Sequence, residues 1–361
     1  MAETTTVNAA SAELGAVKGR RTYKTITRRK YLILVSLAVA LVLSLLLDIS
    51  VGPARLSIWQ VGSTIIMPDS SGVVTRVIIW DIRMPMALMA VIVGAALAIA
   101  GAEMQTILNN PLASPFTLGI SAAAGFGAAL AIVLGVSVIP FAGIFLVSVN
   151  AFFFAMLASL VIYFFSRLRG VTVQTIVLLG IALVFLFTSL LALLQYIASE
   201  EALQQVVFWT LGSLVKATWP KIGIATGVLL VTTPLFIRQV WMLTALRLGD
   251  AKAQSLGVNV EKLRLQVLIS TSVLAAAAVA FVGTIGFVGL VGPHVARMLV
   301  GEDQRFFLPT SAVAGAFLLS VTSIVSKSII PGTLFPIGIV TSLVGIPFFL
   351  SLILTQRRQL W

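Results

Sequence analysis

Long apolar runs separated by short polar breaks follow one another from Tyr31 to Leu354. An α-helix needs roughly 20 apolar residues to cross a bilayer, and the runs reach that length. The spacing of the breaks predicts about ten crossings at roughly 20 residues each, with two or three breaks that are ambiguous. The pattern therefore predicts an all-α, polytopic membrane protein.

Composition excludes a water-soluble fold. Hydrophobic residues make up 59% of the 361 residues, charged residues 10%, and the mean hydropathy is +1.09. That balance leaves too little polar surface to cover a soluble domain. We expect a basic tail over residues 1–30, one transmembrane domain over 31–356 and a short terminus over 357–361. Residues 1 to about 17 show no apolar pattern and are expected to form a mobile tail.

The net charge of +12 follows the predicted topology. Basic residues cluster before the first apolar run, which by the positive-inside rule places the N-terminus in the cytoplasm. Counting crossings puts residues 167–169, the loop 238–264 and the C-terminus on the same side. Topology and attraction to anionic lipid account for the basic excess, so no nucleic-acid partner is expected.

The residue types needed for enzyme or cofactor chemistry are scarce. The chain has no cysteine and one histidine, His294, with no carboxylate nearby in its segment, so neither a metal site nor another cofactor is expected. There is no HExxH motif, paired intramembrane aspartate or serine–histidine constellation, so the chain is not expected to be an enzyme. No Gly-Lys dipeptide occurs, so a phosphate-binding GxxxxGK[ST] loop is absent and ATP would have to be bound by a partner.

Four local patterns predict further structure. Residues 57–66 read as an amphipathic helix at the outer interface. Gly and Ala recur every three or four residues in Gly94–Gln105 and Gly119–Ile132, which favours close helix packing. The glycines around His294 predict an unwound stretch, with a short helix beginning at His294 after Pro293 whose ring bonds freed carbonyls.

The cytoplasmic loop 238–264 has a helix of its own. Asp250 is expected to cap it, Gly257 to end it, and Ala251 and Ala253 to give it a small-residue face. A capped helix with such a face suits docking into a groove on another protein, whereas a plain connector would not need one.

The sequence resembles the FecCD-type permeases, the membrane subunits of ABC importers for iron-siderophores, haem and vitamin B12. The resemblance runs from about Tyr31 to Leu354 and rests on several motifs in the expected order, which are VGAALAIAGAEMQ, NNPLASPFTLGIS, LGDAKAQSLGVNV, GTIGFVGLVGPHVARMLVGEDQRFFLP and FPIGIVTSLVGIPFFLSLIL. It implies a type II importer permease fold in the bacterial cytoplasmic (inner) membrane with both termini cytoplasmic.

The resemblance also implies partners and cargo. The partners are a pair of ATPase subunits, a second permease subunit and a periplasmic or lipid-anchored substrate-binding protein. The expected cargo is an iron-siderophore complex, with haem or vitamin B12 as alternatives.

The resemblance assigns roles to individual positions. The ATPase contact falls on Gly249, Asp250, Ala251, Ala253 and Gly257. Docking of the binding protein falls on Arg83 and Lys327, with Arg76 as a further basic residue. In the family, arginine is usual at the positions of Met86 and Lys327, and aspartate at that of Ser323, so docking here is expected to depend on fewer ion pairs. Thr172, Gln174, Thr341 and Gly345 are expected to line the pathway.

Glu103 is the feature that favours a different class of transporter. An acidic residue near the inner end of a span suggests proton coupling, as in a secondary transporter. The family usually has an uncharged residue there. Because Glu103 lies close to the cytoplasmic turn, we expect it to reach the interface or to pair with a basic loop residue.

Overall fold

The computed structural model describes residues 2–54, 56–139, 142–168, 172–330 and 333–356, with side chains from residue 23 onward except at 70, 352, 353, 355 and 356. All regular secondary structure among these residues is helical, and none of them forms a β-strand. The α-helices are α1 (Ala2–Ser50), α2 (Ile58–Ile66), α3 (Val73–Val77), α4 (Met84–Ile107), α5 (Ile120–Leu134), α6 (Leu146–Ser166), α7 (Val173–Ile197), α8 (Glu200–Thr210), α9 (Trp219–Leu246), α10 (Asp250–Ser255), α11 (Val260–Val282), α12 (Val288–Val300), α13 (Gln304–Ser328) and α14 (Ile337–Gln356).

The number of apolar helices confirms the predicted architecture. Seven helical segments of the described chain, those of α1, α4, α6, α7, α9, α11 and α13, are long and apolar enough to cross a membrane. Shorter apolar helices occur at Ile120–Leu134, Val288–Val300 and Ile337–Ser351. Together these make ten apolar helices, seven long and three short, as expected for an all-α polytopic protein.

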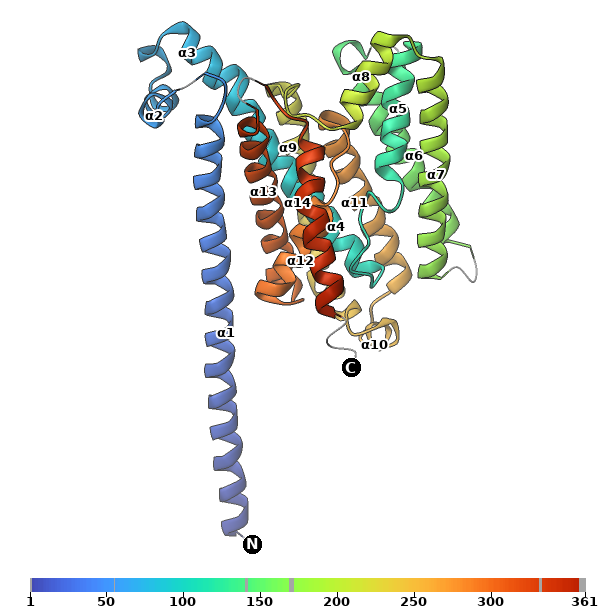
Figure 1. Cartoon of the computed structure of the whole chain (residues 1–361). Coiled ribbons are helices and arrows are strands. Elements are labelled where there is room, and N and C mark those ends of the chain that lie inside the picture. The colour runs from blue at the N-terminus through green and yellow to red at the C-terminus, as the bar shows by residue number, and fades with distance from the viewer. Residues whose placement is uncertain (1, 55, 140–141, 169–171, 331–332, 357–361) are drawn as a thin grey trace.

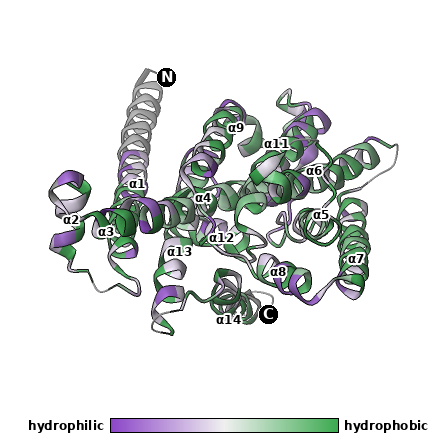
Figure 2. Cartoon of the chain, turned by 90° about the horizontal axis from the view of Figure 1, so that it is seen from above, coloured by the Kyte–Doolittle hydropathy of each residue, from purple (hydrophilic) through white to green (hydrophobic). Residues whose placement is uncertain are grey.

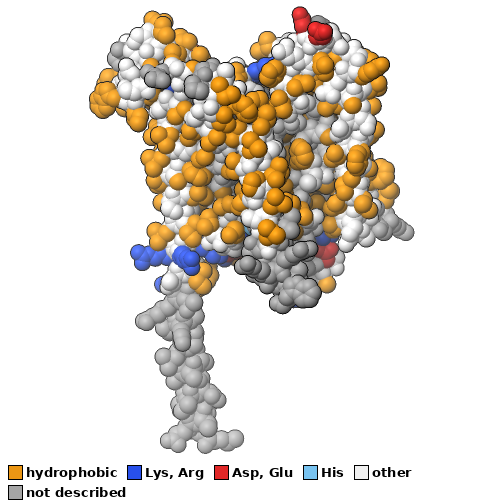
Figure 3. Space-filling model, in the orientation of Figure 1, with side chains coloured by type: hydrophobic (Ala, Val, Ile, Leu, Met, Phe, Trp, Pro, Cys, Tyr) orange, Lys and Arg blue, Asp and Glu red, His pale blue; other side chains and the backbone are white. Residues whose placement is uncertain are grey.

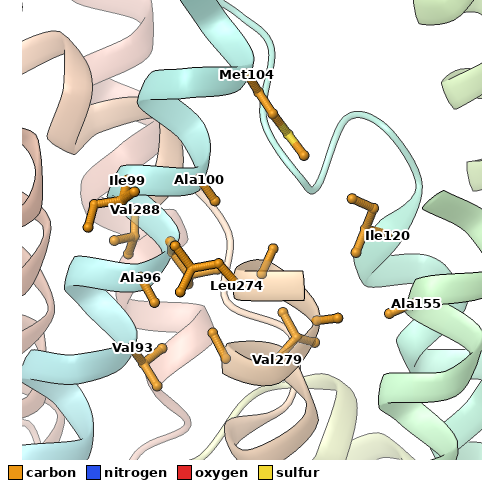
Figure 4. Packing of buried hydrophobic residues seen from close by; sticks show 14 of the residues in the cluster. Val93, Ala96, Ile99, Ala100, Met104, Ile120, Ala155, Leu274, Val279 and Val288 are labelled. Atoms are coloured by element: carbon orange, nitrogen blue, oxygen red, sulfur yellow. The ribbon is translucent and has the colours of Figure 1, made fainter. Parts of the chain in front are cut away.

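Helix α4 runs through the centre of the bundle. It packs against α9, α11, α12 and α13. Helices α5 to α8 lie on the side of the molecule away from α1, α2 and α3 (Figures 1 and 2). Figure 4 shows the aliphatic core at this centre, where Val93, Ala96 and Ala100 of α4 lie near Leu274 and Val279 of α11. These side chains are almost completely buried, so α4 is the helix most enclosed by protein.

Helix α1 is longer than the sequence predicts. It starts at Ala2, so residues 2–17, which were expected to form a mobile tail, are helical, and their mobility stays a prediction. Ala, Glu and Leu at positions 9–14 are strong helix formers and extend the helix of the first span towards the N-terminus. The N-terminal half projects beyond the rest of the bundle (Figure 1), and basic side chains gather where α1 leaves it (Figure 3).

Glycines bring the central helices into backbone contact, which confirms the packing predicted from the small-residue stretches. A Cβ built at Gly94 would overlap the backbone of Gly315 on α13, and one at Gly101 would overlap the carbonyl oxygen of Gly289 on α12. At Gly127 of α5 it would overlap the backbone of Asn150 on α6. Without side chains at these points the helices approach more closely than any other residue allows.

The break near the only histidine lies before the position that the sequence indicates. Helix α11 ends at Val282, and residues 283–287 are not helical. Phe287 has a left-handed φ of 65°, and α12 starts at Val288, so His294 lies inside that helix and not at its start. The Phe287 ring fills the space where Gly345 of α14 lacks a Cβ.

The predicted amphipathic helix after α1 is present as α2. Ser57 and Gln60 form a capping box, in which each side chain accepts a hydrogen bond from the other residue's backbone N–H. Ile58, Trp59 and Ile66 are largely exposed, while Val61 and Thr64 are buried. The exposed apolar face suits the membrane interface at the end of α1 opposite the N-terminus.

Candidate functional site

The loop 238–264 contains the predicted short helix, α10, but Asp250 does not cap it. The N-cap is Gly249, with φ 98°, and Gly257, with φ 82°, follows the helix end as expected. Ala253 is completely buried, so of the predicted alanine face only Ala251 is exposed. Leu256, the C-cap of α10, is the large apolar side chain at this surface, and it is 65% exposed.

Asp250 pairs with a basic residue of the following helix. Its two carboxylate oxygens accept hydrogen bonds from Nη1 and Nη2 of Arg264 at 2.9 and 2.8 Å. The Nε of Arg264 donates to the carbonyl oxygen of Ile107, the last residue of α4, at 2.8 Å. A planar guanidinium can serve all three acceptors at once. The start of α10 is thereby fixed to the end of α4.

A hollow of about 360 Å³ adjoins this contact. Asp250, Gln254 and Arg264 line one side and Thr172, the N-cap of α7, lines the other. The hollow is open beside α10, and its lining is mixed polar and apolar. It gives a second protein a recess next to the exposed surface of α10.

Two arginines share one carboxylate beside α10. Arg247, which follows α9, forms an ion pair with Glu302, and Nε of Arg297 on α12 lies 3.1 Å from the same oxygen without the angle of a hydrogen bond. Arg297 also donates to the side-chain oxygen of Gln105 on α4 at 2.9 Å. Burial lowers the pKa of the Arg247 guanidinium.

Glu103 does not reach the interface, and it does not form an ion pair with a described residue. Its side chain on α4 is completely buried, and neither carboxylate oxygen has a hydrogen-bond partner among the described residues. Arg247 interacts with it electrostatically but is bonded to Glu302. The expectation of snorkelling is therefore wrong. Helix α4 is enclosed on the side of Glu103 by other helices, so a two-carbon side chain cannot reach water.

At the opposite end of the bundle, Lys327 is buried and does not face a partner. Its Nζ lies 2.7 Å from Oδ1 of Asp48, and the exposures of the two side chains are 3% and 0%. Ser323 donates to the same oxygen at 2.9 Å. Asp48 of α1 thus supplies a carboxylate beside Ser323, where the family resemblance leads one to expect an aspartate. The charge of Lys327 is thus paired inside the chain, and its expected docking role stays a prediction.

Arg83, the other docking residue that the resemblance implies, is also buried in this chain, and its docking role stays a prediction. The residue is 4% exposed and lies in a π-helical segment, Ile78–Arg83. Its guanidinium donates to the carbonyl oxygens of Ile49 and Ser50, the last two residues of α1, and of Ala54 beyond it. It satisfies orphan carbonyls at a helix end, a structural use of the arginine fork. Arg76 remains exposed, with 54% of its side chain accessible, in an ion pair with Asp69.

The predicted pathway residues divide into two groups. Thr172 and Gln174, at the start of α7, are exposed. Thr341 is 3% exposed and donates to the carbonyl of Gly338, and Gly345 lies against Phe287. On this chain alone the two α14 residues face inward, while Leu343, Val344 and Ile346 present the exposed face of that helix. The pathway role of all four stays a prediction.

His294 has no metal partners. No group of three or more candidate ligands occurs among the described residues. The ring packs edge-on against Phe348 of α14, with centroids 5.6 Å apart, in place of the hydrogen bonds expected from the sequence.

Sequence reasoning missed three residues of these sites. Asp48 and Arg247 were assigned no role, and Arg264 was counted only as a basic loop residue. A signal existed for Asp48, because it is an acid at the end of an apolar run and the missing family aspartate left a basic residue without a partner. Nothing in the local sequence links Arg247 to Glu302, since the two lie 55 positions apart.

Comparison with known proteins identifies the family. The chain matches the FecCD transport family over residues 40–355. It is 39% identical over 282 residues to the hemin transport system permease protein of Yersinia pestis, covering 78% of this chain and 84% of that one. It is 40% identical over 282 residues to a "Probable iron chelatin transport system permease protein" of Helicobacter pylori, covering 78% and 83%.

A solved structure agrees in fold. It is described as "An inward-facing conformation of a putative metal-chelate type ABC transporter", with a TM-score of 0.79, 31% sequence identity, and coverage of 90% of this chain and 99% of that chain. Helical architecture, matched length and sequence all point the same way. The chain belongs to the FecCD transport family and is a permease subunit of an ABC transporter, a multi-pass membrane protein that is not itself an enzyme.

Proposed function

We propose that this chain is the permease subunit of an ATP-driven importer that moves an iron-siderophore complex across the cytoplasmic (inner) membrane of a bacterium. The observation that carries the proposal is the match along residues 40–355 to a family whose similar members are named for hemin and iron chelatin transport. Metal chelates are the class of cargo that the names of these similar proteins share. Haem and vitamin B12 are the alternative cargoes.

Helix α10 is the proposed contact for a pair of ATPase subunits. The exposed Leu256 and Ala251 beside the open hollow offer an apolar ridge and a recess, and the Asp250–Arg264 pair connects that surface to α4. Gly249 and Gly257, both with positive φ, fix the two ends of the ridge. Both termini are proposed to lie on this cytoplasmic side, where basic side chains gather (Figure 3).

On the outer side, Arg76 is the proposed contact for a substrate-binding protein. It is the one of the three expected docking residues that stays exposed. A second permease subunit is proposed to complete the pathway, with the exposed α14 face and the start of α7, including Thr172 and Gln174, turned towards it. Thr341 and Gly345 would reach the pathway only if α14 turned.

The test is transport by the complex purified through a tag on this chain and reconstituted in vesicles. We expect a radio-iron-loaded siderophore to accumulate when ATP reaches the ATPase and to continue when an ionophore collapses the proton gradient. Accumulation without ATP, or its loss with the ionophore, would identify a secondary transporter and overturn the proposal. If unlabelled haem or vitamin B12 prevents accumulation of the labelled siderophore, that competitor becomes the proposed cargo instead.

The docking assignment has its own test. Arg76→Glu is expected to weaken binding of the binding protein to the reconstituted complex, because it reverses an exposed charge. Arg167→Glu on the opposite side of the membrane is the matched control. Equal affinities for both variants would remove Arg76 from the docking surface.

A further inference from the structure

The carboxylate of Glu103 is buried without a partner at the centre of the permease. It lies one turn before the end of α4, is 0% exposed, and neither oxygen is hydrogen-bonded among the described residues. A carboxyl group kept from water is stabilised by a cation or by hydrogen-bond donors, and no described residue donates a hydrogen bond to this one. Glu103 is therefore able to accept a donor that is bonded elsewhere in this structure.

Arg247 belongs to a cluster of charged groups at this part of α4, because its partner Glu302 also faces Arg297, which donates to Gln105, two residues after Glu103, at 2.9 Å. Its present bond is to Glu302, whose side chain is 46% exposed, so the pair is partly screened by water. Arg297 lies beside the same carboxylate at 3.1 Å. If Arg247 leaves, Glu302 keeps Arg297 and Glu103 gains Arg247, so each of the two acids then faces one guanidinium, whereas both guanidiniums face Glu302 in the structure.

Arg247 lies just before α10 in the chain, and α10 is the proposed contact for the ATPase subunits. It follows the last residue of α9 and stands three positions before Asp250, the first residue of α10. Only Leu248 and Gly249 lie between them, so the chain that links Arg247 to α10 is short. A displacement of α10 towards the bundle would carry Arg247 with it.

We propose that Glu103 is the second acceptor for Arg247, and that exchange of Arg247 from Glu302 to Glu103 connects movement of α10 to α4. The inference rests on the proposed function, because the ATPase supplies the movement. Helix α4 packs against α9, α11, α12 and α13, so a new bond at Glu103 acts on the helices around it. Glu103 is a positioning residue and does not contact the cargo.

The experiment uses the whole complex in vesicles and measures cargo imported per ATP hydrolysed. Glu103→Gln keeps the side-chain volume and removes the charge, so we expect import per ATP to fall about fivefold or more while ATP hydrolysis continues. Glu302→Gln frees Arg247 for Glu103, so we expect ATP hydrolysis without binding protein to rise about twofold or more. A purely structural role predicts instead that import and ATP hydrolysis fall together in each variant.

A double-substitution cycle tests the contact itself. If the two residues act as one unit, Arg247→Gln and Arg247→Gln with Glu103→Gln have the same import per ATP, because the second change removes nothing further. Glu200→Gln, in the exposed first turn of α8, is the control for loss of a carboxylate. Thermal melting in detergent checks that each variant folds; should Glu103→Gln not fold, the Glu302→Gln and Arg247→Gln arms decide.

Failure of the proposed exchange can be distinguished from failure of the proposed function. A wild-type complex that imports with ATP, together with a Glu103→Gln complex of unchanged import per ATP, overturns the exchange and leaves the proposed function standing. Additive losses in the cycle also overturn it. A wild-type complex that does not respond to ATP rejects the proposed function instead.

Discussion

The buried ion pair between Asp48 and Lys327 predicts a large loss of stability when only one partner is removed. Lys327→Met keeps most of the side-chain volume but leaves the Asp48 carboxylate 0% exposed, with the Ser323 hydroxyl as its remaining donor at 2.9 Å. Breaking a buried pair in this way costs about 3–5 kcal/mol. A single hydrogen bond to a charged group returns about 1.5–3 kcal/mol at most, and Ser323 already makes that bond in the wild type.

The assay is equilibrium unfolding of the purified chain by SDS in mild-detergent micelles, followed by helix content. We expect Lys327→Met to lower the free energy of unfolding by about 3 kcal/mol or more, and Asp48→Asn with Lys327→Met to recover at least about 1 kcal/mol of it, since the double variant has no unpaired charge. A loss below about 1 kcal/mol in the single variant, or additive losses, would refute the assignment of a buried ionic pair.

Two further predictions follow from local geometry. Gly101→Val should prevent stable folding, because its side chain would meet the Gly289 carbonyl, whereas Gly62→Val, in open space on α2, should change the melting temperature little; similar melting temperatures would contradict the packing. Arg305 holds the pKa of Asp303 below its usual value, mainly through its side-chain hydrogen bond. The carboxylate therefore stabilises the fold above its unfolded pKa of about 4 and loses this effect as pH falls through the lower folded value. Wild-type melting should exceed that of Asp303→Asn at neutral pH by an amount that shrinks on acidification, and a constant difference would contradict it.

The sequence predicted the elements far better than the roles of single charges. Ten apolar helices, the amphipathic α2 and the short α10 all follow from local periodicity and caps, which depend on neighbouring residues. Glycine contacts such as that of Gly101 were predictable as a class, because small residues at helical spacing have few other uses in a membrane.

The contacts of single charged residues could not be predicted, because their partners are distant in sequence. Lys327 was predicted to face outwards, and the carboxylate that holds it inside lies on α1, 279 positions away. Arg83 was read as a docking residue, although its acceptors are backbone carbonyls, which leave no mark in a sequence. Asp250 looked like a helix cap until Arg264, one helix later, accounted for its carboxylate.

The left-handed Phe287 has a consequence for how the last helix can move. The first turn of α14 is held by hydrogen bonds from Ile337 and Gly338 to the carbonyls of Gly212 and Leu211, and one ring lies against its middle at Gly345. The ring occupies the space beside Gly345, so α14 cannot come closer to the unwound stretch at this point unless Phe287 moves. The left-handed residue therefore sets the smallest separation between the last helix and the unwound stretch.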